Sequence, residues 1–332
     1  MPDMSSPRKP PRRFWLFAPY VIALIAALAW SAAWFVLSAA AVGRMDATAV
    51  RLRAKGWTVA WSARTVSGFP FRIDVSLRDP RLAEPSGWAI AAPRIDSEAY
   101  AYAPTHWVLV APGGLTLTRP GRGAVVIAGH ALRASVAASL DHRPPRVAIE
   151  GLGLTLTPAP GAKPLPISGC DHLGLYLRPT AGDQAEFQLN LQGASPSAGA
   201  LIERLAPGQT VSLVWDQSLT QVSALHGRTW PAAVQAWSAA GGGLVQAHGQ
   251  LSAAGLDLTL SADRLTVGPD GRVEGPLSAK LHNGKGPLFV GEAAILASLF
   301  STDMQLRDGA LWLGPFKIAG APRVYTPEPN AN

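Results

Sequence analysis

The segment FRIDVSLR, residues 71–78, indicates how most of the chain folds. Apolar and polar residues alternate along it without interruption, so an extended strand would have one apolar face and one polar face. The sequence GFPF, residues 68–71, begins this run, and its glycine and proline favour a bend before the strand. Phe69 and Phe71 would then lie on the same side, where we expect them to pack in a core.

The same alternation recurs along the chain. It is found at residues 115–118 (LTLT), 152–157 (LGLTLT), 173–178 (LGLYLR), 187–192 (FQLNLQ) and 256–261 (LDLTLS). Turn sequences such as APGG at 111–114 and RPGRG at 119–123 lie between these runs. The pattern predicts a mainly β (α+β) fold, in which one or two large, curved antiparallel sheets have one apolar side and a few short helices packed on it.

Before the first strand, residues 14–42 read FWLFAPYVIALIAALAWSAAWFVLSAAAV and contain no charged side chain. About 20 apolar helical residues cross the roughly 30 Å hydrocarbon core of a bilayer, so this run predicts a transmembrane helix. Phe14, Trp15, Trp34 and Phe35 are its expected membrane-anchoring residues. The alternative is a buried helix of a large soluble core, but such helices rarely reach this length without a charge.

Four basic residues precede the predicted span and four follow it within residues 44–55, so their number does not decide the orientation. The first four lie in a short tail directly before the apolar run, as in the charged region of a signal sequence. We therefore expect the tail in the cytoplasm and the body outside it. Cleavage after the small residues 38–40 is an alternative, but a cleavable signal has an apolar region of only about 7–15 residues.

The composition shifts divide the chain into segments. We expect a basic tail (1–13), a transmembrane helix (14–42), a helical connector ended by Gly56 (43–56), a β-rich body (57–320) and a flexible tail (321–332). The body could contain two sub-sheets, at about 57–195 and 207–320. Short helices are expected at 197–206, 229–240 and 287–300, a turn at 268–271, and a last strand at 310–318.

The net charge of +7 is concentrated near the predicted span. Residues 1–55 contain eight Lys or Arg and only two acidic residues, so the rest of the chain is almost neutral. Nucleic acid is bound by clustered positive charge, which the body lacks, so we expect no nucleic-acid partner. Basic residues beside a membrane span instead favour anionic lipid headgroups, and membrane lipids are the expected partners.

The sequence does not favour catalysis, and we expect no enzyme, no metal and no cofactor. No two of the seven histidines have the i, i+4 spacing of a helical metal pair, and residues 241–243 (GGG) lack the Lys of a phosphate-binding loop. Cys170 and His172 could lie on one side of a strand, which permits a nucleophile and its base. A buried cysteine is the more ordinary interpretation.

Several short motifs follow one another in an order that is informative. They are Gly56-Trp57, GFPFR at 68–72, Trp88 with AAP at 91–93, residues 102–110 with His106, Trp237, Gly241-Gly242, LTV at 265–267 and GRVEG at 271–275. Together with the tail and span, this order resembles the family of anchored bacterial envelope proteins known as domain of unknown function 2125. The resemblance covers about residues 15–318. It implies a bacterial inner-membrane protein with a single span, a cytoplasmic N-terminus and a periplasmic body, but no activity.

The span and the repeated Leu-x-Leu strands are similar, less closely, to the AsmA-like group, which is implicated in lipid traffic or envelope homeostasis. Our first hypothesis is therefore a membrane-anchored protein whose β-groove binds lipid or another hydrophobic ligand. The residues expected to line this groove are Phe69, Phe71, Ile73, Val75, Leu77, Leu154, Leu156, Leu258 and Leu260. The alternative for the same residues is a closed, filled core.

Two further hypotheses remain open. A closed β-domain could serve as a scaffold for another envelope protein, through an exposed edge strand or through the predicted helix that carries Trp230 and Trp237. An envelope hydrolase is the third hypothesis, with His106 and Cys170 as the residues to test.

Overall fold

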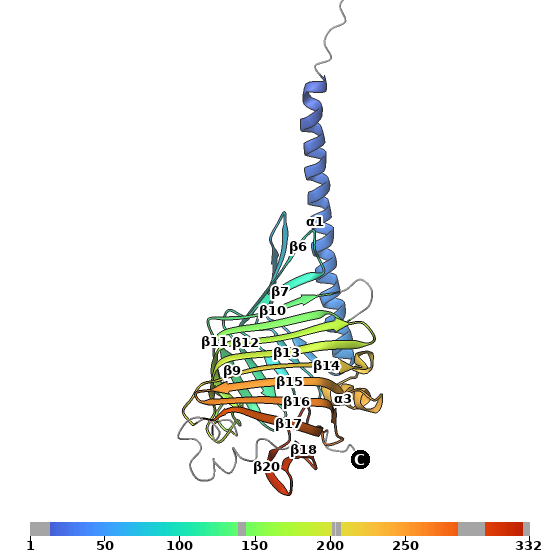
Figure 1. The fold of residues 1–332 in the computed structure, drawn as a ribbon. Helices are drawn as coiled ribbons and strands as arrows, with labels where there is room; N and C mark the ends of the chain where they lie inside the picture. Colours follow the sequence, from blue (N-terminus) through green and yellow to red (C-terminus); the bar gives the residue numbers. More distant parts are fainter. Residues whose placement is uncertain (1–13, 139–143, 201–202, 204–206, 285–302, 328–332) are drawn as a thin grey trace, which may run out of the picture.

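The computed structural model describes residues 14–138, 144–200, 203, 207–284 and 303–327. In this part of the chain, one long helix lies beside a large β-sheet (Figure 1). The helical elements are α1 (Phe14–Ala54), the 3-10 helix η1 (Val222–Ala224) and α3 (Trp230–Ala239). The first ten strands are β1 (Thr58–Ala60), β2 (Ala63–Ser67), β3 (Arg72–Arg78), β4 (Arg81–Ala83), β5 (Ala89–Ala91), β6 (Arg94–Tyr100), β7 (His106–Val110), β8 (Leu115–Arg119), β9 (Gly123–Ala128) and β10 (Ala131–Ala137). The other strands are β11 (Arg146–Pro158), β12 (Ile167–Thr180), β13 (Gln184–Pro196), β14 (Val211–Thr220), β15 (Leu244–Ala253), β16 (Leu256–Val267), β17 (Val273–Gly284), β18 (Asp303–Arg307), β19 (Ala310–Leu313) and β20 (Phe316–Gly320).

Helix α1 combines the predicted span and the predicted connector in one continuous helix. Over Phe17–Ala54 it is long and apolar enough to cross a membrane, and it is the one such candidate among the described residues. Gly56 follows its last turn with φ +86°, a conformation that favours glycine. The predicted apolar helix at the N-terminus is thus confirmed.

The sheet is an antiparallel meander in which long strands are bent. The pairs β1/β2, β3/β4, β5/β6, β7/β8 and β9/β10 each form one long strand with a short break. The register is kept across most breaks: Ala63 pairs with Arg78 and Ala60 with Arg81. Across the longer break between β7 and β8 it shifts by one residue. Beside the unbroken strand β11, Ala131 pairs with Leu152 and Ala128 with Thr155.

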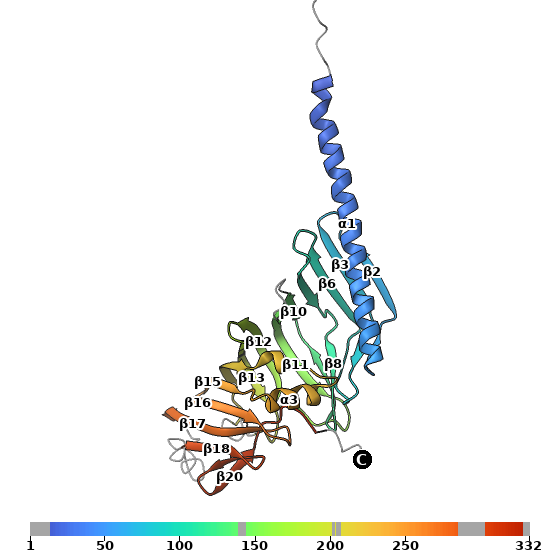
Figure 2. The same cartoon turned by 90° about the vertical axis from the view of Figure 1, so that its right-hand side faces the viewer.

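The breaks lie next to one another and form a crease across the sheet. They contain bend-forming residues such as Pro80, Pro93 and Gly129. The crease continues into the unbroken strands beyond β9/β10. In β11 it contains Gly153 (φ +55°), and in β13 it contains Gly193 (φ +58°), which lies at a shift in the register with β14. Bulges of this kind bend a strand, so the sheet folds along this line. Figure 2 shows the sheet curving from β2 and β3 beside α1 to β17 and β18 on the far side.

Three apolar clusters stabilise this arrangement. One lies at the crease, where Leu154 (3% exposed) and Leu191 (8%) pack with Leu115 and Ile127 from beyond the fold line. A second joins β14–β19 around Leu258 and Leu277. In the third, α3 packs Val234 and Trp237 against Val267 of β16.

Helix α3 agrees with the helix predicted at 229–240. The hydroxyl of Thr229 caps its N-terminus by accepting a hydrogen bond from Ala232 N (3.3 Å), and Pro231 lies in its first turn. Trp237 is 3% exposed and donates from Nε1 to the Thr220 carbonyl (2.6 Å). Val234 and Trp237 of the apolar stripe therefore pack against the sheet.

The structure confirms the expected mainly β fold with a large antiparallel sheet, and differs from the sequence expectations at three places. Strand β13 pairs with β14, so hydrogen bonding continues across the division expected between two sub-sheets. The strand expected at 310–318 is a hairpin of β19 and β20, because Gly314 (φ +55°) and Pro315 form a turn within it. The helix expected at 287–300, and half of the one at 197–206, lie outside the described residues. Residues 197–200 form a turn in which Ala200 N donates to the Ser197 carbonyl (3.0 Å).

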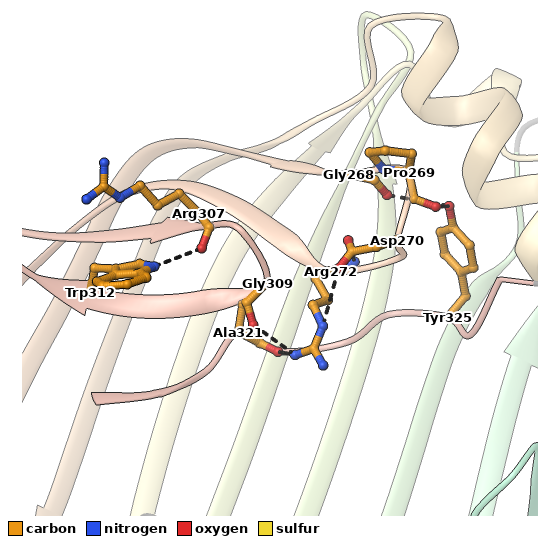
Figure 3. A network of polar contacts seen from close by, with 9 residues as sticks. All are labelled: Gly268, Pro269, Asp270, Arg272, Arg307, Gly309, Trp312, Ala321 and Tyr325. Carbon is orange, nitrogen blue, oxygen red and sulfur yellow. Dashed lines mark hydrogen bonds and ion pairs between the residues drawn. The ribbon is translucent and has the colours of Figure 1, made fainter. Parts of the chain in front are cut away.

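The third difference is the beginning of the expected flexible tail, which packs against the sheet (Figure 3). Tyr325 is 2% exposed and its hydroxyl donates to the Pro269 carbonyl (3.1 Å). Arg272 donates to the carbonyl oxygens of Gly309 (3.1 Å) and Ala321 (2.8 Å). One aromatic anchor and one shared arginine therefore order residues 321–325.

Candidate functional site

The apolar side of the folded sheet is the candidate site, because its side chains form continuous rows across many strands. Residues opposite one another in a register share a face, so the rows can be followed strand by strand. The first row lies at the crease and contains Leu132, Gly151, Leu173, Leu191, Leu213, Leu251 and Leu258. The second row contains Leu109, Ala134, Ile149, Leu175, Leu189, Trp215, Gly249, Leu260 and Ala279. The third row contains Trp107, Val136, Val147, Leu177 and Phe187.

Exposure increases with distance from the crease. In the first row, Leu132, Leu191, Leu251 and Leu258 are buried. Most members of the second row and every residue named for the third are only half-buried. The side chains therefore fill the fold line but leave apolar surface accessible farther from it.

Helix α1 covers the beginning of this apolar face. The second row continues through Ser97 and Val75 to Val66 in β2, and Arg64 lies on the same face, opposite Leu77. The guanidinium of Arg64 binds Asp46 of α1 through two contacts (2.6 and 3.2 Å). The apolar rows therefore start beneath the helix that carries the predicted span and extend away from it.

The opposite face of the same strands is polar. Its residues in register include Ser135, Ala148, Tyr176, Gln188, Asp216 and His248. They line a hollow of about 790 Å³ together with the ion pair formed by Arg178 and Glu186. Val147, Leu177 and Phe187 of the third row also border this hollow, so polar and apolar residues both line it.

Two pairs of oppositely charged groups on the polar face bind each other, Arg178 with Glu186 and Arg133 with Glu150. Arg133 Nε donates to Glu150 (2.7 Å), and the hydroxyl of Tyr176 donates to the other carboxylate oxygen (3.2 Å). The hydrogen bond from Arg133 is the main cause that lowers the pKa of Glu150, whereas burial and the bond to Glu150 raise the pKa of Tyr176. These groups stabilise one another and do not form an activated acid and base.

The residues considered for catalysis are separated. Cys170 is 5% exposed and packs in the crease cluster, and burial raises the pKa of its thiol. His172 lies in register with Gln192 and with Leu152, which is 44% exposed on the other face. The sequence allowed Cys170 and His172 to act as a nucleophile and its base, but in the structure Cys170 belongs to the buried crease cluster and His172 does not. No group of three His, Cys, Asp or Glu residues that could hold a metal ion occurs in the part of the chain that the structure describes.

Most of the residues expected to line a groove lie on the apolar face. Ile73, Val75 and Leu77 are on the β3 part of it, and Leu258 and Leu260 are in the first and second rows. Leu154 and Leu156 pack in the crease cluster.

Phe69 and Phe71 are placed elsewhere. They are 52% and 62% exposed at the end of the β2–β3 hairpin, and Phe69 contacts Trp34 and Phe35 of α1 (centroid distances 5.4 and 6.1 Å). The expectation that they pack in the sheet core is wrong, because the bend at residues 68–70 carries them beyond the sheet. Trp34 lies on the side of α1 that contacts the hairpin and is 6% exposed. The side chains of Phe14 and Trp15 lie outside the described part.

The sequence expectations missed the half-buried rows of the middle strands, including Leu175, Leu177 and Leu189. Their signal was present in the alternating runs 173–178 and 187–192. Choosing them required knowledge of which positions along each strand lie far from the crease, and that depends on long-range pairing.

Comparison with known proteins identifies the family of this chain. A scan against protein families matches residues 34–285 to the family described as "Uncharacterized protein conserved in bacteria (DUF2125)". Comparisons with curated proteins and with solved structures give no match. The matched region begins within α1 and ends just after β17, and it includes all the rows described above. The chain therefore belongs to the bacterial DUF2125 family, with an N-terminal apolar helix and a large β-sheet.

Proposed function

We propose that this protein is an envelope protein of the bacterial inner membrane, anchored by α1, that binds the acyl chains of lipids on the apolar face of its sheet. Its role is in lipid traffic or envelope homeostasis and is non-enzymatic. The observation that carries the proposal is the continuity of the apolar rows. The second row is in register from Val75 in β3 to Ala279 in β17.

The size of this face favours a lipid over a small ligand. Strands are about 4.8 Å apart, so the row from β3 through β17 extends over roughly 50 Å if the sheet is followed along its curve. A contiguous apolar surface larger than a few hundred Å² usually has a partner. An acyl chain is the ligand whose length and lack of polar groups fit this row, in which the hydroxyl of Ser97 donates to the Val75 carbonyl (2.9 Å).

The position of α1 suggests where lipid would reach the rows. The rows start beneath α1, where Arg64 binds Asp46, and lead away from the helix. We propose that the basic tail stays in the cytoplasm, that α1 crosses the membrane once, and that the body lies in the periplasm. Lipid would then leave the outer leaflet of the inner membrane beside α1 and continue along the rows.

The proposal is tested by lipid extraction and mass spectrometry of the purified full-length protein. The variant Leu189→Asp places a charge in the second row, and Gln188→Asp places the same charge one residue away on the polar face. We expect co-purified lipid in the wild type and in Gln188→Asp, and a marked loss in Leu189→Asp. Equal lipid content in the two variants, or no lipid bound by the wild type, would contradict the proposal.

A further inference from the structure

Two neighbouring hairpin ends form an exposed group of aromatic rings. Residues 67–71 connect β2 to β3, residues 100–105 lead from β6 to β7, and Ala101 N donates to the Phe71 carbonyl between them (2.9 Å). Phe69, Phe71, Tyr100 and Tyr102 are 52%, 62%, 52% and 69% exposed. The rings of Tyr100 and Tyr102 are stacked at 5.0 Å. We call these four residues the aromatic tip.

The tip is uncharged, and charge begins directly behind it. Residues 67–71 and 100–105 contain no Asp, Glu, Lys or Arg. Arg72, the next residue of β3, forms ion pairs with Glu98 (3.3 Å) and Asp74 (3.5 Å). Amphipathic rings followed by charged groups are typical of side chains at a membrane–water interface.

Helix α1 fixes where the tip lies along the membrane normal. Trp30 Nε1 donates to the Pro70 carbonyl (2.9 Å), and Trp34 Nε1 donates to the Arg72 carbonyl (2.6 Å). The part of α1 before Trp30, residues 14–29, has a length of about 24 Å at 1.5 Å per residue. That length spans most of the roughly 30 Å hydrocarbon thickness of a bilayer, so Trp30 and the hairpin ends would lie near the far boundary of the hydrocarbon core. In Figure 1 the hairpin ends lie beside α1, on the side of the sheet nearest the free part of this helix.

We infer that the aromatic tip inserts into the headgroup region of the bilayer that α1 crosses. The tip and Trp30 then form one aromatic layer at the membrane surface, and the hydrogen bonds from Trp30 and Trp34 hold the body against it. The sheet therefore keeps a fixed height and orientation on the membrane. The inference depends on the span and not on lipid binding by the rows.

The test uses the full-length protein in nanodiscs of phosphatidylcholine and phosphatidylglycerol that contain a nitroxide-labelled phosphatidylcholine. An environment-sensitive fluorophore is attached to Phe71→Cys or Tyr102→Cys. Leu24→Cys, at a position 60% exposed on the free part of α1, is the membrane reference. Phe316→Cys is the matched control, since Phe316 is 66% exposed in β20, far from the free part of α1 (Figure 1). The wild type, with the buried Cys170, gives the background.

We expect the nitroxide lipid to quench the label at positions 71 and 102 nearly as strongly as at position 24, and to leave position 316 unchanged. If the label is quenched at position 24 but is not quenched at either 71 or 102, the inference is overturned, and a protein partner for the tip is favoured. Far-UV circular dichroism verifies the fold of each variant, and if one tip variant does not fold, the other provides the test. Lipid extraction from the same variants tests the proposed function separately.

Discussion

Replacing Leu154 by alanine should destabilise the fold strongly, because this side chain fills the crease. Leu154 is 3% exposed, and a Cβ added at Gly129 or Gly151 would lie 2.7 or 2.5 Å from one of its methyl groups. Its methyl groups therefore rest on glycine backbone, which has no side chain that could move into the cavity. Buried Leu→Ala substitutions cost about 2.7–5 kcal/mol, and limited relaxation favours the upper half of this range, at about 4 kcal/mol.

The assay is thermal unfolding of the full-length protein in detergent, followed by far-UV circular dichroism. At about 2–4 °C per kcal/mol for a domain of this size, the Leu154→Ala midpoint should lie roughly 8–16 °C below that of the wild type. Leu152→Ala is the matched control in the same strand, because Leu152 is 44% exposed on the opposite face. Its expected decrease is about 1 kcal/mol or less, hence only ~2–4 °C. Equal decreases in the two variants would refute the crease as a packed fold line.

Three further predictions follow from single contacts. Because Arg133 lowers the pKa of Glu150, their pair stabilises the folded state above the ordinary carboxyl pKa of about 4.3 and loses this effect as the pH falls below it. At pH 7 the melting point of Glu150→Gln should be lower than that of the wild type, by an amount worth under ~1 kcal/mol, and this difference should shrink as the pH falls below about 4.3. A difference that does not depend on pH would contradict the pairing. Trp34→Ala should free the β2–β3 hairpin from α1 and accelerate amide hydrogen exchange over residues 67–72. Val36→Ala, at a position that is 68% exposed on the same helix, should leave this exchange unchanged. Unchanged exchange in Trp34→Ala would show that the hydrogen bond from Trp34 to Arg72 does not hold the hairpin. Cys170 should react with a thiol reagent far more slowly in the folded protein than in denaturant, because it is 5% exposed and burial raises the pKa of its thiol. Rapid reaction in the native state would contradict the packing of Cys170 in the crease.

Local sequence patterns predicted the parts of this fold that depend on local physics. The apolar run at 14–42 and the alternation at 71–78 correspond to α1 and β3, and residues 229–240 contain the capping Thr229, Pro231 and the apolar stripe of α3. In each case the residues that form the element also carry its hydrophobic period or its cap.

The crease could not be predicted, because it arises from breaks in strands that are far apart in sequence. Pro80, Pro93 and Gly153 each look like an ordinary turn or bulge. Only the long-range register places them on one line. The same limit explains the misplacement of Phe69 and Phe71, whose surroundings are determined by α1 and not by their own strand.

The order of residues 321–325 also depends on distant contacts. A Pro-rich end without periodicity is typical of a loose segment. Instead, the hydroxyl of Tyr325 donates a hydrogen bond to the Pro269 carbonyl, and Arg272 donates one to the Ala321 carbonyl. Neither partner can be identified from the composition of the tail.

Photocrosslinking along β12 and β13 tests the central claim most directly. A photoreactive amino acid is placed at positions 175, 177, 187 and 189 on the apolar face, and at positions 176 and 188 on the polar face. Cells that produce the full-length variants are labelled with radioactive phosphate and irradiated. If lipid occupies the apolar rows, radiolabelled phospholipid will be attached at 175, 177, 187 and 189 and not at 176 or 188. Equal labelling on both faces, or none on either, would contradict the account.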